Sequence, residues 1–358
     1  MIENLFTFLR HTVFAATGLI LMLALLHLAL RPFEKPKDLG VLSAKKAALS
    51  ERADSYDAIF LGTSQTFRNI DPDGIEAAAN CPLSVYNAGV PGLVLEELSD
   101  FIATLGETGT TGKLIIFNDP LPPRPDFNAV TNVRTQSYTT YANLPDRYRN
   151  IWSLPAPLWK KAALSGFSIG AYAYKFLGIG LLSKILFPHV SVTPEKYLPG
   201  LNKENGYPDL RADIKNNEEI ATRARRFQGR ADKWQDNVLA KQGAITPPSE
   251  NMIEAAKRRA NLIKTLANKI TEQGNSPAFI VFPETETHRQ DLALIAAVQK
   301  AAPELAIING YERANAKGLW NKEYVFYEAH LNMKGATLFS KSIAGQICNI
   351  YQSSGGGE

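Results

Sequence analysis

Two polar residues far apart in the sequence have the types needed for nucleophilic catalysis. Ser64 follows the apolar run Ala58–Leu61 and Gly62, so it lies just beyond the end of a short buried strand. His330 lies in YEAHLNMKGA, just before the last helical pattern. A serine becomes a nucleophile when a base such as histidine takes its proton. The two residues can form a catalytic pair if the fold brings them together.

Each of these residues also has a simpler structural interpretation. A serine after a strand commonly caps the helix that follows it, and a histidine before a helix is commonly a capping or surface residue. The sequence G-T-S-Q-T around Ser64 differs from the G-x-S-x-G nucleophile elbow, so it does not indicate an α/β-hydrolase. Neither residue therefore identifies a catalytic site alone.

The segments around the two residues alternate between strand and helix patterns. Continuous apolar strands that alternate with helices predict an α/β fold of flavodoxin-like type, with a parallel sheet covered by helices on both faces. The predicted strands span 57–62, 83–89, 113–119, 277–284 and 305–310, and the predicted helices span 71–81, 95–107, 250–273 and 287–302, with a last helix after His330.

Polar residues that could do chemistry follow the ends of these predicted strands. Ser64 follows the first strand, Gly89 ends the second, Asn118 follows the third, and Glu328 and His330 come after the fifth. Ligands of open parallel sheets bind at the carboxyl ends of the strands. We therefore expect these residues to meet at one edge of the sheet.

The regular alternation stops between residues 120 and 245, which we interpret as a large insertion. Within it, the segment 165–187 is apolar, with only Lys175 and Lys184 charged. Two interpretations remain open: a buried pair of helices, or a helix that lies on a membrane surface. Four glycines in the segment weaken a single long helix.

The N-terminal region has the pattern of a membrane anchor. Twenty residues without a formal charge separate Arg10 from Arg31, which is about the length that crosses a ~30 Å hydrocarbon core. The segment has no polar face, and no clear cleavage site of a signal peptide precedes Arg31. The predicted organisation is an anchor at 1–35, a connector at 36–54, an α/β domain at 55–350 with the insertion at 120–245, and a flexible tail at 351–358.

Charge and motifs argue against several classes of function. A net charge of +4, dispersed along the chain, is too small to indicate nucleic-acid binding. The two cysteines lie too far apart for a zinc motif, and the chain contains neither a phosphate-binding loop nor a dinucleotide fingerprint. We therefore expect no metal, no organic cofactor and no nucleic-acid partner.

The two cysteines lie at the ends of segments that a flavodoxin-like fold brings together. Cys81 comes just past the helix after the first strand, and Cys348 lies near the end of the last helix. In such a sheet these two helices cover the same face and run the same way. Either the cysteines form a disulfide, which an oxidising compartment permits, or they are two buried free thiols.

Together, these blocks resemble the SGNH/GDSL hydrolase superfamily. Gly62 and Ser64 match its first block, and Gly89 in YNAGVPG matches the second. Asn118 in IIFND matches the third, without the usual glycine before it, and His330 in EAHLNMKG matches the last.

The resemblance covers roughly residues 55–120 and 277–350. It is greatest for membrane-anchored members that assist polysaccharide or cell-wall O-acylation. It implies that His330 deprotonates Ser64, which takes an acyl group, most often acetyl. It also implies an oxyanion hole made by the N–H groups of Ser64 and Gly89 with the Asn118 side chain.

The acid of the family's triad is displaced in this chain. That acid usually lies three residues before the histidine, where this sequence has Tyr327, whereas Glu328 lies two residues before His330. Three alternatives follow: Glu328 is a shifted acid, the site is a Ser–His dyad, or the site is degenerate.

The resemblance further implies a place and partners. Such members work on the outer face of the bacterial cytoplasmic membrane, so we expect the main domain in the periplasm or outside. The expected partners are a polysaccharide or cell-wall glycan, a membrane-bound O-acyltransferase and the lipid bilayer. The positive-inside rule argues for the opposite orientation, because several positive charges follow the span and only Arg10 and the α-amino group precede it. The charges that follow are Arg31, Lys35, Lys37, Lys45 and Lys46.

Three functions fit these observations. The first is a serine acyltransferase that acts beside a membrane-bound partner. The second is a non-catalytic accessory protein that binds a glycan or an acyltransferase through a degenerate site. The third is an exported lipid or carbohydrate esterase without a partner.

Overall fold

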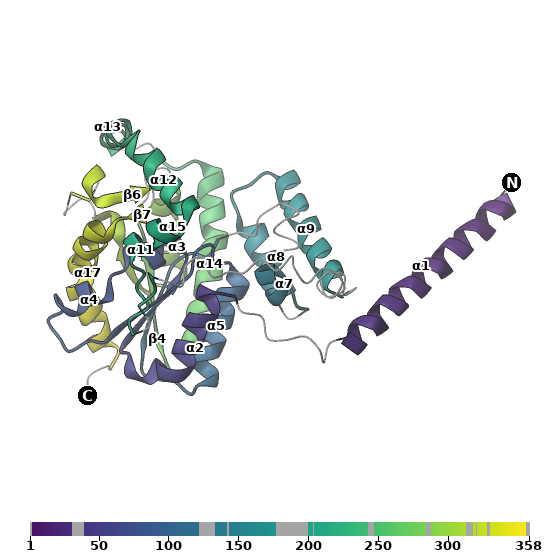
Figure 1. The fold of residues 1–358 in the computed structure, drawn as a ribbon, viewed down its shortest axis with the longest axis horizontal. Helices are drawn as coiled ribbons and strands as arrows, with labels where there is room; N and C mark the ends of the chain where they lie inside the picture. Colours follow the sequence, from purple (N-terminus) through teal and green to yellow (C-terminus); the bar gives the residue numbers. More distant parts are fainter. Residues whose placement is uncertain are drawn as a thin grey trace.

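The structure, a computed structural model, contains a five-stranded parallel sheet with helices on both faces (Figure 1). It describes residues 2–30, 39–121, 133–141, 143–176, 200–202, 204–242, 247–283, 288–312, 318–319, 321–327 and 330–355. The strand order is β2-β1-β3-β4-β5, which is the flavodoxin-like order. The strands are β1 (Ala58–Gly62), β2 (Val85–Gly89), β3 (Leu114–Phe117), β4 (Ser276–Val281) and β5 (Ala306–Asn309). The predicted α/β fold, with a parallel sheet between two helix layers, and all five predicted strands are confirmed.

Helices form two layers because the strands are apolar on both sides. One layer packs on Ile59, Ile115 and Phe279, and the other packs on Phe60, Ile116 and Ile280. The first layer consists of α2 (Val41–Arg52), α5 (Leu95–Glu107), α14 (Glu250–Glu272) and α15 (His288–Ala301). The second contains α4 (Pro72–Glu76) and α17 (Met333–Ser353). The predicted helix at 71–81 is shorter than expected, because it ends at Glu76.

The predicted connector at 36–54 is largely part of the folded domain. Helix α2 buries Val41, Leu42 and Leu49 in the same core as the first helix layer. The domain therefore begins near residue 39 rather than at residue 55.

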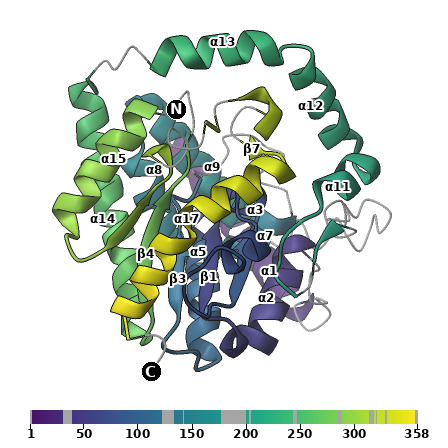
Figure 2. The same cartoon turned by 90° about the vertical axis from the view of Figure 1, so that its left-hand side faces the viewer.

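The described parts of the insertion form two groups of helices, without strands that join the sheet. The first group packs beside α14 and contains α7 (Val133–Tyr138), α8 (Leu144–Ser153) and α9 (Leu158–Phe176). The second contains α11 (Leu210–Asn216), α12 (Glu218–Gln228) and α13 (Ala231–Gln242). Figure 2 shows the second group arching over the end of the sheet near β7. Of the apolar segment 165–187, residues 177–187 lie outside the described residues.

The N-terminal helix α1 (Ile2–Leu30) is long and apolar enough to span a membrane. Its window Phe6–Leu25 has a mean hydropathy of 1.7, and none of it is buried against the rest of the chain. Figure 1 shows it projecting away from the sheet domain.

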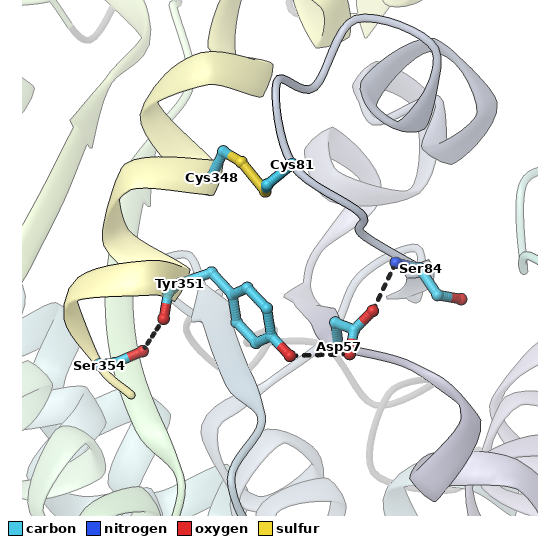
Figure 3. Close-up of a disulfide and its surroundings, with 6 residues drawn as sticks. All are labelled: Asp57, Cys81, Ser84, Cys348, Tyr351 and Ser354. Atoms are coloured by element: carbon cyan, nitrogen blue, oxygen red, sulfur yellow. Dashed lines mark hydrogen bonds between the residues drawn. A yellow bond between two sulfur atoms is a disulfide. The ribbon is translucent and has the colours of Figure 1, made fainter. Parts of the chain in front are cut away.

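A disulfide joins the last helix to the first β-α unit (Figure 3). Cys81 and Cys348 are bonded, with Cα atoms 6.0 Å apart, so the first of the two alternatives for the cysteines is confirmed. Near the bridge, Tyr351 Oη donates to Asp57 Oδ1 at 2.8 Å, and Ser84 N donates to Asp57 Oδ2 at 2.8 Å. These bonds tie α17 to the start of β1 and to the loop before β2.

We predict that the change Cys81→Ser lowers the free energy of unfolding by about 2–5 kcal/mol, because the unfolded chain has more conformational entropy without the bridge than with it. Urea unfolding in detergent, compared with Cys348→Ser and the double variant, measures this loss. The three variants should be equally destabilised. Quantitative maleimide labelling of the denatured, unreduced wild-type protein would contradict the bridge.

Candidate active site

Ser64 lies at the carboxyl edge of the sheet, where the chain leaves β1. Thr63 caps the helix α3 (Ser64–Asn69), and Ser64 is the first residue of that helix. Gly62 is required at the strand end, since a Cβ atom there would lie 2.0 Å from Asn118 Oδ1 and 2.2 Å from Thr66 Oγ1. The tight exit from β1 thus presents the serine at the rim of the sheet.

His330 comes from a small hairpin and contacts Ser64. The strands β6 (Val325–Tyr327) and β7 (His330–Leu331) pair in antiparallel fashion, and Leu331 N donates to Asn69 Oδ1 at 2.8 Å. This bond fixes the hairpin to α3. His330 Nε2 lies 2.9 Å from Ser64 Oγ, so the predicted proximity is confirmed, whereas the catalytic roles stay a prediction.

The surroundings of His330 favour one tautomer. The backbone carbonyl of Tyr327 favours a protonated ring nitrogen, and the Tyr327 ring stacks on the His330 ring with centroids 6.0 Å apart. Because Nε2 faces Ser64, Nδ1 is the nitrogen left to carry a hydrogen toward that carbonyl. A neutral imidazole that donates from Nδ1 has an unprotonated Nε2, which can accept the serine proton.

Burial lowers the pKa of His330 to about 4, and the charges of Arg68 and Arg223 add to this effect. The hydrogen bond to Tyr327 acts in the opposite direction but does not offset the burial. The ring is therefore neutral, and able to act as a base, throughout the range above about pH 5.

Glu328 lies outside the described residues, so its role as a shifted acid stays a prediction. The carbonyl of Tyr327 already does part of what such an acid does, because it orients the ring and selects the tautomer. The described residues thus form a Ser–His dyad oriented by the backbone.

The two remaining oxyanion candidates have different surroundings. Asn118 is buried beside Ser64: Thr63 N donates to its Oδ1 at 3.0 Å, and its Nδ2 donates to Thr63 Oγ1 at 3.2 Å. Gly89 N instead donates to Asn87 Oδ1 at 2.9 Å. In this conformation the hydrogen of Gly89 that was expected to help form the oxyanion hole is therefore bonded to Asn87.

Gly89 has a packing role instead. A Cβ atom at Gly89 would lie 2.3 Å from the backbone nitrogen of Phe67. Only a residue without a side chain lets α3 approach β2 this closely. The glycine of the second block thus fixes the position of the helix that carries Ser64.

Asn87 and Lys45 stabilise the position of α3 through buried hydrogen bonds. Neither residue was predicted to have a role in the site. Asn87 Nδ2 donates to the carbonyls of Thr66 at 2.9 Å and Ile70 at 2.7 Å. Lys45 Nζ donates to the backbone carbonyl of Asn87 at 2.6 Å. Burial lowers the pKa of Lys45 well below its ordinary value, and Arg68 adds to the effect. The sequence feature that could have indicated the burial of Lys45 is its position in the apolar stripe of α2, four residues before Leu49.

A buried ion pair connects α3 to the insertion. Arg68, on α3, pairs with Asp213 of α11, and both side chains are at most 5% exposed. At the end of β3, Asp119 pairs with Arg259 of α14. Sequence analysis missed both pairs, because nothing in the local patterns links residues so far apart.

Within the described residues, no group of three His, Cys, Asp or Glu side chains is arranged to hold a metal ion. Comparisons with protein-family models, with curated proteins and with solved structures gave no match to this chain.

We predict that Asn87→Ala lowers the free energy of unfolding by at least about 2 kcal/mol, because it leaves buried backbone groups of α3 and β2 without partners. Urea unfolding measures the loss. The control is Asn216→Ala, whose side chain bonds only to an exposed carbonyl of its own helix and should matter by less than about 0.5 kcal/mol. Equal effects of the two changes would contradict the role of Asn87.

We also predict that His330 titrates with a pKa of about 4, measured by NMR of histidine-labelled protein. Arg223→Gln should raise this pKa, since it removes a positive charge that opposes protonation. Arg226→Gln removes an exposed charge from the same helix and should leave the pKa unchanged. A titration near the ordinary value of about 6.5 would contradict the buried environment.

Proposed function

We propose that this protein is a membrane-anchored serine acyltransferase or esterase of the SGNH type, which transfers or removes acetyl groups on a polysaccharide outside the cytoplasm. The observation that carries the proposal is the contact of 2.9 Å between Ser64 Oγ and His330 Nε2. It joins residues 266 positions apart at the edge where parallel sheets bind ligands.

The geometry supports a two-step acyl transfer. His330 Nε2 takes the proton of Ser64 as Oγ attacks the acyl carbonyl carbon, and the Tyr327 carbonyl stabilises the imidazolium through Nδ1–H. Nε2–H then protonates the leaving oxygen as its bond to the carbonyl carbon breaks, which leaves the acyl group on Ser64. In the second step a sugar hydroxyl or water loses its proton to Nε2 and attacks the ester, and Ser64 recovers its proton from His330.

The proposed oxyanion donors are the N–H group of Ser64 and the side chain of Asn118. Ser64 is the first residue of α3, and the N–H groups of the first helical turn have no acceptor within the helix. Asn118 Nδ2 carries two hydrogens and gives one to Thr63. Gly89 is left out because its N–H group is bonded to Asn87.

The proposed location is the outer side of a bacterial cytoplasmic membrane, with α1 as the single span. The disulfide between Cys81 and Cys348 supports this orientation, because structural disulfides are typical of oxidising compartments. A glycan substrate and a membrane-bound O-acyltransferase partner are proposed from the family resemblance alone.

The test of the chemistry is acyl-enzyme formation. With p-nitrophenyl acetate, the wild-type protein should gain the mass of one acetyl group and release p-nitrophenol, whereas Ser64→Ala should lose at least about 10³-fold in rate. Ser353→Ala, an exposed serine on α17, is the control. If the wild-type protein neither hydrolyses the ester nor acetylates an oligosaccharide, the accessory-protein alternative replaces the enzymatic one.

The test of the orientation uses reporter fusions at the C-terminus. An alkaline phosphatase fusion should be active, and a reporter that works only in the cytoplasm should be silent. The reverse pattern would place the domain in the cytoplasm, as the positive-inside rule indicates.

A further inference from the structure

Helix α9 and the end of α8 expose large apolar side chains to solvent. Trp159 is 72% exposed and Ile169 is 59% exposed. We call the exposed set the α9 face; it consists of Trp152, Leu158, Trp159, Ile169 and Phe176. Leu158, Ile169 and Phe176 recur at helical spacing, so they lie on one side of α9, and exposed apolar residues gathered in this way mark a surface that contacts something else.

Helix α9 buries polar side chains and exposes apolar ones, which is the reverse of an ordinary surface helix. Its buried stripe contains Lys161 and Ser168 beside Leu164 and Ala171. Apart from Lys160, the exposed residues between Trp159 and Phe176 are small or apolar, and a Cβ atom built on Gly166 or Gly170 would meet nothing within 4 Å. A helix that faces water normally places its polar residues outward.

The sequence that contains α9 carries charges of a single sign. No acidic residue occurs between Asp146 and Glu195. The basic residues in this stretch are Arg147, Arg149, Lys160, Lys161, Lys175 and Lys184. Of these, Lys160 is exposed next to Trp159, whereas Lys161 is buried and Arg147 is buried in a pair with Glu96. Exposed tryptophan and aliphatic side chains among lysines, without acidic residues, suit the interface of a membrane that carries anionic lipids.

A bilayer is within reach because the same chain carries α1. Nine peptide units join Leu30 to Leu39, so they hold the start of the folded domain within about 32 Å of the end of α1. Figures 1 and 2 both place α7, α8 and α9 on the side of the domain from which α1 projects.

We propose that the α9 face lies in the headgroup interface of an anionic bilayer, on the side of the membrane where the domain is located. The proposal needs α1 as a membrane span, but it does not depend on the chemistry proposed for Ser64. The apolar side chains enter the interface, and the exposed Lys160 beside them meets the lipid phosphates. The domain is then held at the membrane both by α1 and by the α9 face.

The test uses the full chain in liposomes of phosphatidylcholine with phosphatidylglycerol. Since the two native cysteines are bonded to each other, a single new cysteine can carry a nitroxide label. Ile169→Cys places the label on the α9 face, and Gln352→Cys, exposed near the end of α17, is the control. Spin relaxation by oxygen and by a water-soluble nickel chelate then reports the surroundings of each label.

The label at Ile169 should be accessible to oxygen and lose accessibility to the chelate, while the label at Gln352 stays accessible to the chelate. In phosphatidylcholine alone, the protection at Ile169 should weaken. Two results would overturn the proposal. Equal chelate access at both positions would mean that the face is in water, and protection of Ile169 from both reagents would mean that protein covers it.

Discussion

The close approach of α3 to the ends of β1 and β2 is the constraint on which the rest of the site depends. A methyl group at Gly62 or Gly89 would collide with Asn118 or with the backbone of Phe67. This approach buries the backbone carbonyls of Thr66 and Ile70, and the side-chain amide of Asn87 donates a hydrogen bond to each of them. The position of the serine is thus fixed by backbone packing rather than by contacts of the serine itself.

The sheet could be predicted from the sequence because each strand is a continuous apolar run that ends at a glycine or a polar residue. The same logic predicted that the first and last helices share a face, which brings Cys81 and Cys348 close together, but it left open whether they are bonded, as the structure has them. The start of the domain was less predictable. Helix α2 contains two adjacent lysines, so it resembles a charged connector, yet Lys45 is fully buried. The buried ammonium group of Lys45 donates a hydrogen bond to a backbone carbonyl of β2, and no local sequence pattern reveals this contact.

The candidate site was predictable in outline but not in its hydrogen bonds. The proximity of Ser64 and His330 follows from strand order, since both come after strand ends at one edge. The bonding of Gly89 N to Asn87 depends on one side-chain rotamer, and the orientation of His330 depends on the hairpin β6–β7. The sequence also gave no sign of the pair between Arg68 and Asp213, because the insertion that supplies Asp213 has no recognisable periodic relation to the sheet.

The disulfide between Cys81 and Cys348 closes a covalent ring across a sequence separation of 267 residues. The ring includes most of the sheet, the whole insertion and His330, whereas α1 and Ser64 lie on the N-terminal arm outside it. A protease that cuts the insertion therefore opens the ring without releasing a fragment: the N-terminal piece contains α1 in its own backbone, and the C-terminal piece stays attached to it through the bond between Cys81 and Cys348. A cut between Leu30 and Leu39 has the opposite result, since it separates the folded domain from α1 in one piece. Proteolysis within the insertion thus leaves the pieces linked, whereas proteolysis in the short segment after α1 separates the folded domain from that helix.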